Sequence, residues 1–241
     1  LSIPPNNEIQ KRMISEHRLN TIPDPTYGGQ LQDLAIQGHN AEGKMHIEYQ
    51  EIKQSFSDGT TVSLRKPTYS IEDWKYGPPH PLLQISPRVA SPMIGLGLLE
   101  AISQKDILAN ADPEDKDNDG ISAKANIVWD LQRQKVSLGR FGWKAGEPNI
   151  LQQSAKAFNG DIGISSTLTV SPWGDCSYKQ EKCRNAPNGN TPEQNNLEIS
   201  PEAMEKLVFY SQNLAVPARR DIDKPQVLAG KKLFYEIGCV K

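Results

Sequence analysis

The stretch that decides the fold reads LGRFGWKA over residues 138–145, followed after a turn by ILQQSAKAF over residues 150–158. Glycine lacks a Cβ atom, so Gly139 and Gly142 allow another group to approach the backbone closely. The second run has apolar residues at helical spacing, and Pro148 before it suits the first turn of a helix that Asn159-Gly160 should end. We therefore expect a corner that presents cations and Trp143 beside an amphipathic helix. The alternative is a tryptophan-anchored corner of the core.

Composition narrows the class of protein. The 241 residues could form one large domain or two small ones, and the net charge of −2 gives no basis for a nucleic-acid partner. No apolar run approaches the roughly 20 residues of a membrane helix, so we expect no membrane span. The 18 glycines and 18 prolines accompany long polar stretches without periodicity. These features predict a mainly α fold with long ordered loops.

The clearest strand pattern lies in residues 43–66. Apolar and β-branched residues alternate on both sides of Asp58-Gly59, which is typical of a hairpin turn. We expect one small antiparallel β-hairpin, and a third strand at Thr68–Ile71 is left open. Helical patterns occur near 7–16, at about 92–104, and at 200–214 and 224–237. The helix at 92–104 is apolar nearly all round, so we expect it to be buried.

An acidic loop predicts a calcium site. Asp115, Asp117 and Asp119 occupy positions one, three and five of a calcium loop, Gly120 supplies the turn, and the carbonyl of Ile121 could be a ligand. The twelfth position is Asn126 rather than a bidentate glutamate, so coordination should differ from that of an EF-hand. Bound calcium would rigidify the loop leading to residues 138–145. The alternative is a solvated acidic turn.

Two cysteines bear on the cellular compartment. Cys176 and Cys183 flank a short polar loop that a disulfide would close. A disulfide would place the protein outside the reducing cytosol. The alternative is a pair of reduced thiols. Cys239 stands apart, near the last residue of the sequence.

The chain resembles a known family along almost its whole length. The similar segments occur in the same order as in that family: YGGQLQD at 27–33, SPRVA at 86–90, IGLGLLEAI at 94–102, DGIS at 119–122, LGRFGWKA at 138–145, residues 153–163, and LAVPARR at 214–220. Together they resemble the di-haem oxidoreductases, also called thiol oxidoreductases, of the bacterial di-haem cytochrome c peroxidase superfamily.

The resemblance implies two c-type haems, each attached through a Cys-x-x-Cys-His motif, and a cytochrome c peroxidase-like fold that is incomplete here. Cys239 looks like the first cysteine of the second motif. Residues 1–241 then form a single segment between the haem sites, so haem should be absent from this piece and the piece alone inactive. We expect three sub-regions: 1–90 with loops and the hairpin, 91–170 with the calcium loop and the Trp143 corner, and 171–241 with helices leading to Cys239.

The resemblance also suggests site residues. Trp143 resembles a tryptophan that lies between the haems, Gln153 a glutamine and Asp161 an acid that assist peroxide cleavage. A carboxylate near a peroxide can move its proton as general base and acid. Arg88, Arg140 and Lys144 are candidates for contacts with haem, and the two arginines could pair with propionates. The alternatives are core packing for Trp143, a turn role for Asp161 and surface ion pairs for the arginines.

Two functional hypotheses follow. The first is a periplasmic di-haem oxidoreductase that exchanges electrons with a donor protein or a small redox substrate. The second is a calcium-stabilised, non-catalytic binding or docking module. A hydrolase is disfavoured because no nucleophile elbow and no metal-ligand spacing of histidines is present.

Overall fold

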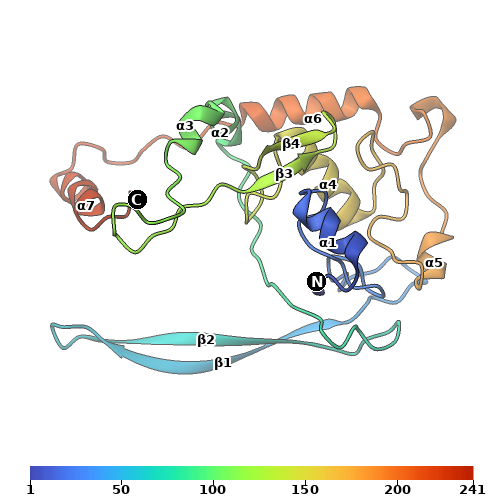
Figure 1. Ribbon diagram of the computed structural model, residues 1–241, viewed down its shortest axis with the longest axis horizontal. Coiled ribbons are helices and arrows are strands. Elements are labelled where there is room, and N and C mark those ends of the chain that lie inside the picture. Colours follow the sequence, from blue (N-terminus) through green and yellow to red (C-terminus); the bar gives the residue numbers. More distant parts are fainter. Residues whose placement is uncertain (241) are drawn as a thin grey trace.

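The computed structural model describes residues 1–240, and its short helices and hairpins are joined by long loops (Figure 1). The helices are α1 (Glu8–Ser15), α2 (Leu96–Ala101), α3 (Gln104–Leu108), α4 (Ile150–Ile162), α5 (Glu181–Arg184), α6 (Pro201–Asn213) and α7 (Pro225–Glu236), with a 3₁₀ turn at Pro192–Gln194. The strands are β1 (Lys44–Ser55), β2 (Thr61–Glu72), β3 (Ile127–Asp130) and β4 (Lys135–Leu138). Lys241, the last residue given and two positions after Cys239, lies outside the described residues.

The expectation of a mainly α fold with one hairpin is wrong. Only 27% of the chain is helical, and 18% lies in strands or isolated β-bridges, with the strands arranged as two small antiparallel sheets. One reason is that the helix expected at about 92–104 is two shorter helices, α2 and α3. Gly95 has a left-handed φ of 77° and Ile102 an extended ψ of 133°, so neither continues a helix. The helix α2 has no buried residue, so the expectation that this region is buried is also wrong.

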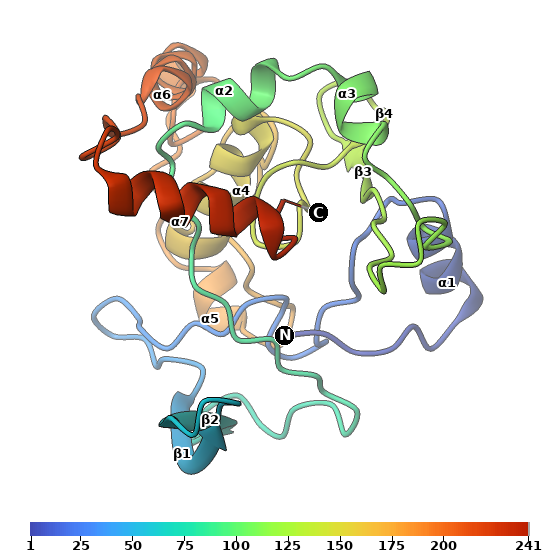
Figure 2. The same ribbon diagram turned by 90° about the vertical axis from the view of Figure 1, so that its left-hand side faces the viewer.

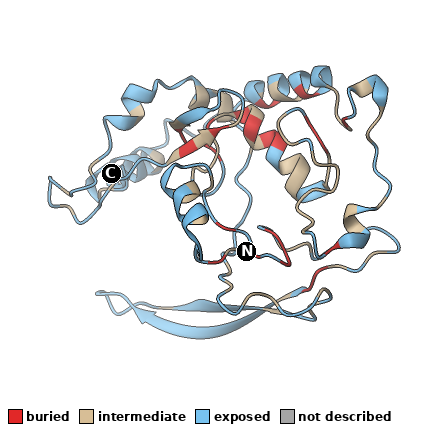
Figure 3. Cartoon of the chain, turned by 45° about the vertical axis from the view of Figure 1, so that its right-hand side comes forward, coloured by how far each residue is buried: buried red, intermediate tan, exposed pale blue. Residues whose placement is uncertain are grey.

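The predicted hairpin at 43–66 is confirmed and is longer than expected. Strands β1 and β2 pair over their whole length, from Lys44 opposite Glu72 to Ser55 opposite Thr61. Residues 68–71 therefore belong to β2 and form no third strand. In Figure 2 this ribbon is seen end-on at the lower edge of the molecule, away from α2, α4 and α6. Almost all of its residues are exposed, as the pale blue ribbon in Figure 3 shows.

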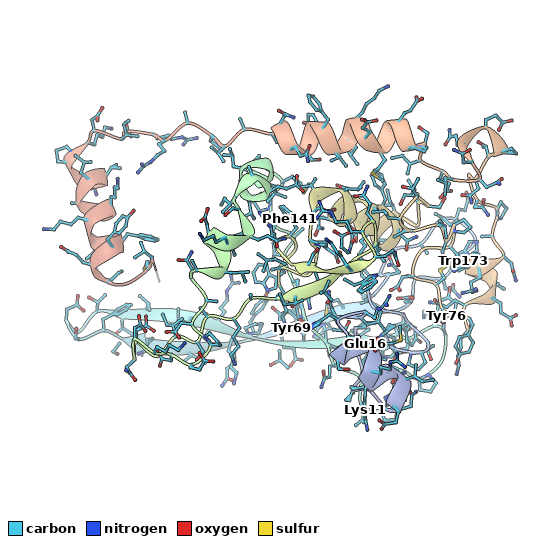
Figure 4. All side chains as sticks on the ribbon, turned by 45° about the horizontal axis from the view of Figure 1, so that its top comes forward. Lys11, Glu16, Tyr69, Tyr76, Phe141 and Trp173 are labelled. Atoms are coloured by element: carbon cyan, nitrogen blue, oxygen red, sulfur yellow. A yellow bond between two sulfur atoms is a disulfide. The ribbon has the colours of Figure 1, made fainter. Side chains whose placement is uncertain are left out.

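The interior forms around α4, which contacts α2 and α6. Buried segments gather on α4, β3 and the inner side of α6 (Figure 3). Phe141 lies beside α4 (Figure 4) and is 1% exposed. The buried hydrophobic residues are Ile3, Ile22, Tyr27, Val128, Leu138, Phe141, Ile150, Ala155, Leu197 and Met204. Since this set is small for so long a chain, polar contacts must hold much of the loop structure.

The helix α4 is the predicted one, with different ends. Asn149 is its N-cap and accepts a hydrogen bond from the backbone N–H of Gln152 at 2.8 Å. The helix continues through Asn159-Gly160 and ends at Gly163, which has a left-handed φ of 70°. Among residues 1–240, no helix is long and apolar enough to cross a membrane.

Candidate functional site

The corner at residues 139–145 is built by its own backbone. The N–H groups of Arg140 and Phe141 both donate to the carbonyl of Glu147, at 2.9 and 3.0 Å. A Cβ atom on Gly139 would lie 1.9 Å from the carbonyl oxygen of Ala145, so only glycine fits there. Gly142 has a φ of 78°, and a Cβ atom there would lie 3.2 Å from Oε1 of Gln153. The close approach expected at both glycines therefore comes from within the chain.

Trp143 lies on the open side of this corner. Trp143 is 61% exposed, whereas Phe141, two positions before it, is buried in the core. Trp143 is therefore no core anchor, and its indole is free to meet a partner that is not part of the described chain. The side chain of Asn126 ties the corner down by donating to the carbonyls of Lys144 and Ala145, both at 3.0 Å.

The three candidate cations have different surroundings. Nη1 of Arg140 donates to the carbonyls of Leu99, Glu100 and Ile102 at 2.9, 3.0 and 2.6 Å. These carbonyls lie at the C-terminal end of α2, where helices leave acceptors unpaired, so Arg140 fixes α2 to the corner. Lys144 is exposed beside Trp143. Arg88 is exposed on a proline-rich loop, where its Nε donates to Oγ of Ser86 at 3.3 Å.

The paired glutamines of α4 have separate environments. Gln152 is buried and structural: its Oε1 accepts from the N–H of Leu131 at 2.7 Å, and its Nε2 donates to the carbonyl of Trp129 at 3.0 Å. Gln153 points its Oε1 at Gly142. That oxygen is buried and has no hydrogen-bond partner within residues 1–240. An unpaired buried acceptor of this kind is uncommon, and it could accept a hydrogen bond from a donor outside the chain.

Asp161 lies at the other end of α4. Eight residues separate it from Gln153, which corresponds to about 12 Å along the helix axis. Asp161 is exposed, and its Oδ1 accepts from Nε2 of Gln30 at 2.7 Å. The structure therefore brings Gln153 close to the Trp143 corner, while Asp161 belongs to a different set of contacts.

Those contacts reach the YGGQLQD segment at residues 27–33. Oδ2 of Asp175 accepts from the N–H groups of Gly29 and Gln30 at 2.7 and 2.9 Å. Gly28 has a φ of 70°, and a Cβ atom there would lie 2.4 Å from the same carboxylate oxygen. Burial raises the pKa of Asp175, although the two N–H donors oppose that shift. This pairing has no local sequence signal, because Asp175 lies almost 150 residues away.

Glu42 is a second buried carboxylate next to this segment. It is 4% exposed, its Oε2 accepts from the N–H of Gln32 at 2.8 Å, and its Oε1 accepts from Nε2 of Gln180. Burial raises the pKa of Glu42 to about 7, because the donated hydrogen bonds only partly offset the lost hydration and Asp175 and Asp24 add repulsion. A group with this pKa exchanges its proton near neutrality, and we did not single it out from the sequence.

The acidic loop brings three carboxylates together, and they are not the three that the sequence predicts. Ligand atoms of Asp112, Asp115 and Asp117 lie within 4.8 Å of one another. Asp119 is outside that group of three, and its Oδ1 accepts from the N–H of Ile121 at 2.8 Å. Asp112 was missed because it precedes the calcium-loop pattern by three residues. The twelfth loop position, Asn126, is committed to the Trp143 corner.

The cysteines are placed as follows. Cys176 and Cys183 form a disulfide, so the predicted bridge is confirmed and the reduced alternative is wrong. Cys239 is a free, exposed cysteine just beyond α7, and its N–H donates to the carbonyl of Phe234 at 3.1 Å.

One comparison with known proteins gives a match. The family model described as "Di-haem oxidoreductase, putative peroxidase" matches residues 2–241. No curated protein and no solved structure matches the chain.

Proposed function

Because the chain belongs to the di-haem oxidoreductase family, we propose that it is the part of a periplasmic c-type di-haem enzyme that lies between the two haems. In this proposal the Trp143 corner faces the haems, and the enzyme exchanges electrons with a donor protein or a small redox substrate. The disulfide Cys176–Cys183 supports an extracytoplasmic location, since such bonds persist in oxidising compartments.

The observation that carries this proposal is the exposed indole of Trp143 on a corner fixed by backbone and side-chain hydrogen bonds. A large aromatic ring normally stabilises a protein by being buried. An exposed ring on a rigid support is therefore consistent with a surface that binds another flat apolar group. Haem, when bound, supplies one-electron iron chemistry. Trp143 would lie against it and offer a π-system between the two sites.

Other residues of the chain would serve the same site. Exposed Cys239 would form a thioether bond, in a motif that needs a further cysteine and a histidine. Arg88 and Lys144 are exposed and could pair with propionates, while Arg140 would hold α2 against the corner and orient the segment.

Gln153 and Asp161 would have different tasks. The Oε1 of Gln153, buried and unpaired beside Gly142, would turn outward to accept a hydrogen bond from a hydroperoxide and so orient it. Asp161 would take up and return a proton as general base and acid. Since the two side chains are about 12 Å apart along α4, Asp161 would do so away from the position of Gln153.

The experiment is electron transfer between the haems of the full-length, haem-loaded protein, followed by stopped-flow absorbance. Trp143→Leu should slow the step at least tenfold, with haem content and melting temperature unchanged. Phe209→Leu is the matched control, because Phe209 is a similarly exposed aromatic at 68%. A wild-type rate in Trp143→Leu would refute the role of Trp143. Absence of covalent haem from the full-length protein would refute the whole proposal.

The carboxylates of Asp112, Asp115 and Asp117 favour a second candidate, a calcium-stabilised module without catalysis of its own. Oxygen ligands converging at this distance suit a hard cation such as calcium. Asp117→Asn should abolish any rise in melting temperature on adding calcium, whereas Glu114→Gln, next to the loop but outside the cluster, should keep it. If the wild-type melting temperature is unchanged by millimolar calcium, this candidate is eliminated.

A further inference from the structure

The disulfide Cys176–Cys183 stands at one end of a series of contacts that reaches the C-terminal turn of α4. Residues 175–183, called here the disulfide loop, include the closed ring and Asp175 just before it, and they contact the 26–42 region at three points. The 26–42 region in turn contacts α4 at two points. It is the one disulfide among residues 1–240, and it joins cysteines seven positions apart. The state of this one bond can therefore affect residues far from it in the sequence.

The first group of contacts joins the disulfide loop to the 26–42 region. Asp175, next to Cys176, holds the N–H groups of Gly29 and Gln30. Ser177 donates its hydroxyl to the carbonyl of Thr26 at 2.6 Å. Gln180, inside the loop, donates to Glu42 and is itself fixed by the N–H of Ser177, which donates to its Oε1 at 2.7 Å.

The second group joins the 26–42 region to α4. Nε2 of Gln30 donates to Oδ1 of Asp161, and Nε2 of Gln32 donates to the carbonyl of Gly160, both at 2.7 Å. The backbone N–H groups of these two glutamines are the ones held by Asp175 and Glu42. Each side chain that reaches α4 thus projects from a backbone position fixed by the disulfide loop.

The disulfide and polar contacts support the loop, among them the hydrogen bond that Nη1 of Arg184 donates to the carbonyl of Cys176 at 3.3 Å. Its helix α5 has four residues and none of them is buried. A four-residue helix is too short to be stable by itself, and without burial it gains little from packing. The covalent bond therefore acts together with polar contacts, such as the one from the N–H of Ser177 to Gln180, in placing Asp175 and Gln180. Both cysteines are partly exposed, so a small thiol can reach them.

We propose that Cys176–Cys183 is a redox-sensitive latch that controls the order of residues 26–33 and, through them, of the C-terminal turn of α4. A thiolate of a dithiol reductant attacks one sulfur, the other sulfur leaves as a thiolate, and the second thiol of the reductant resolves the mixed disulfide. Two electrons and two protons pass to the protein, which ends with two thiols, while the reductant ends as a disulfide. The loop then loosens, and Gln30 and Gln32 no longer keep fixed positions on Asp161 and Gly160.

The test is hydrogen exchange followed by mass spectrometry on the whole chain, before and after treatment with dithiothreitol, with thiol labelling to count open disulfides. Peptides covering 26–33 and 158–163 should exchange at least tenfold faster once the bond is open. Peptides covering β3, β4 and the first turns of α4 should stay protected. This readout needs no haem and no activity, so it is independent of the function proposed above.

Two variants separate the latch from other causes. The double variant Cys176→Ser/Cys183→Ser should show the fast exchange without reductant and no further change with it. Asp175→Ala keeps the disulfide and should free the amides of residues 29 and 30 with the bond intact, so the proposal stays testable if the double variant does not fold. The proposal is overturned if the bond opens and residues 26–33 keep their protection, if protection is lost across the whole chain, or if dithiothreitol leaves the bond closed in the folded protein.

Discussion

Replacing Glu42 by glutamine should remove a large part of the pH dependence of stability. The folded protein holds a proton on Glu42 up to about pH 7, whereas the ordinary pKa of the group is 4.5. The folded state therefore binds this proton more tightly than the unfolded chain does. It follows that the contribution of Glu42 to stability is most favourable at low pH, falls as the pH rises from about 4.5 to about 7, and is level above that range.

The magnitude follows from these two pKa values. One pKa unit corresponds to about 1.4 kcal/mol, and integrating the linkage relation between pH 5 and pH 8 gives a loss of about 2 to 3 kcal/mol from this one group. Screening by solvent should reduce this little, because Glu42 is 4% exposed. Glutamine has no such proton to lose, although it must give up one of the two hydrogen bonds that the carboxylate accepts from Gln32 and Gln180.

The assay is urea unfolding of wild type and Glu42→Gln at pH 5, 6, 7 and 8. The difference in the free energy of unfolding between the two proteins should shift by about 2 to 3 kcal/mol in favour of the variant from pH 5 to pH 8. Contributions from other groups cancel in this comparison. The exposed carboxylate of Glu205 provides a control, and Glu205→Gln should track wild type at every pH. Parallel curves for wild type and Glu42→Gln would refute the assignment of a raised pKa to Glu42.

Three further substitutions test the local contacts by urea unfolding. Gly28→Ala should cost about 3 kcal/mol, because the added Cβ atom meets a carboxylate oxygen at 2.4 Å and the backbone φ is 70°. The control Gly38→Ala has a φ of 88° and open space around the added atom, so it should cost about 1 kcal/mol. Equal losses of stability in the two variants would contradict the clash at Gly28. Asn149→Ala should cost about 1 kcal/mol through the lost N-cap of α4, and Asn149→Ser should restore most of it. Arg140→Ala should cost about 2 kcal/mol, because three carbonyls at the end of α2 lose their hydrogen-bond donor. A loss below about 0.5 kcal/mol, which is the effect of an ordinary surface substitution, would argue that Arg140 does not hold α2 against the corner.

The parts of the fold that were predictable are those set by local sequence. The β1–β2 hairpin was found because its turn contains Asp58-Gly59, a residue pair suited to left-handed backbone. The β3–β4 hairpin was missed because its turn uses Gln134 at a φ of 51°, so no glycine marks it. Its strands have four residues each, too few for a period of two to be recognised.

The candidate site divides in the same way. Gly139, Gly142 and Trp143 could be interpreted from their own stretch, because close approach and an exposed ring depend on nearby backbone. The partner of Asp161 is Gln30, and the partner of the Gly28 turn is Asp175. Neither could be predicted from the sequence, since each lies more than 130 residues away. A side chain that accepts two backbone N–H groups leaves no periodic pattern, so only the folded structure reveals it.

The same distinction explains how Trp143 can be exposed and still held in place. Apolar packing fixes a side chain only where atoms touch it on several sides, and an exposed ring lacks atoms on its open side. Hydrogen bonds are directional, so a few of them can fix the backbone that carries the ring. Around Trp143 the fixing bonds come from Asn126, Arg140 and the carbonyl of Glu147, and the apolar contribution comes from Phe141 on the opposite side of the turn. A corner built in this way can lose its exposed indole at little cost in stability, which is the behaviour that the contact proposed for Trp143 requires.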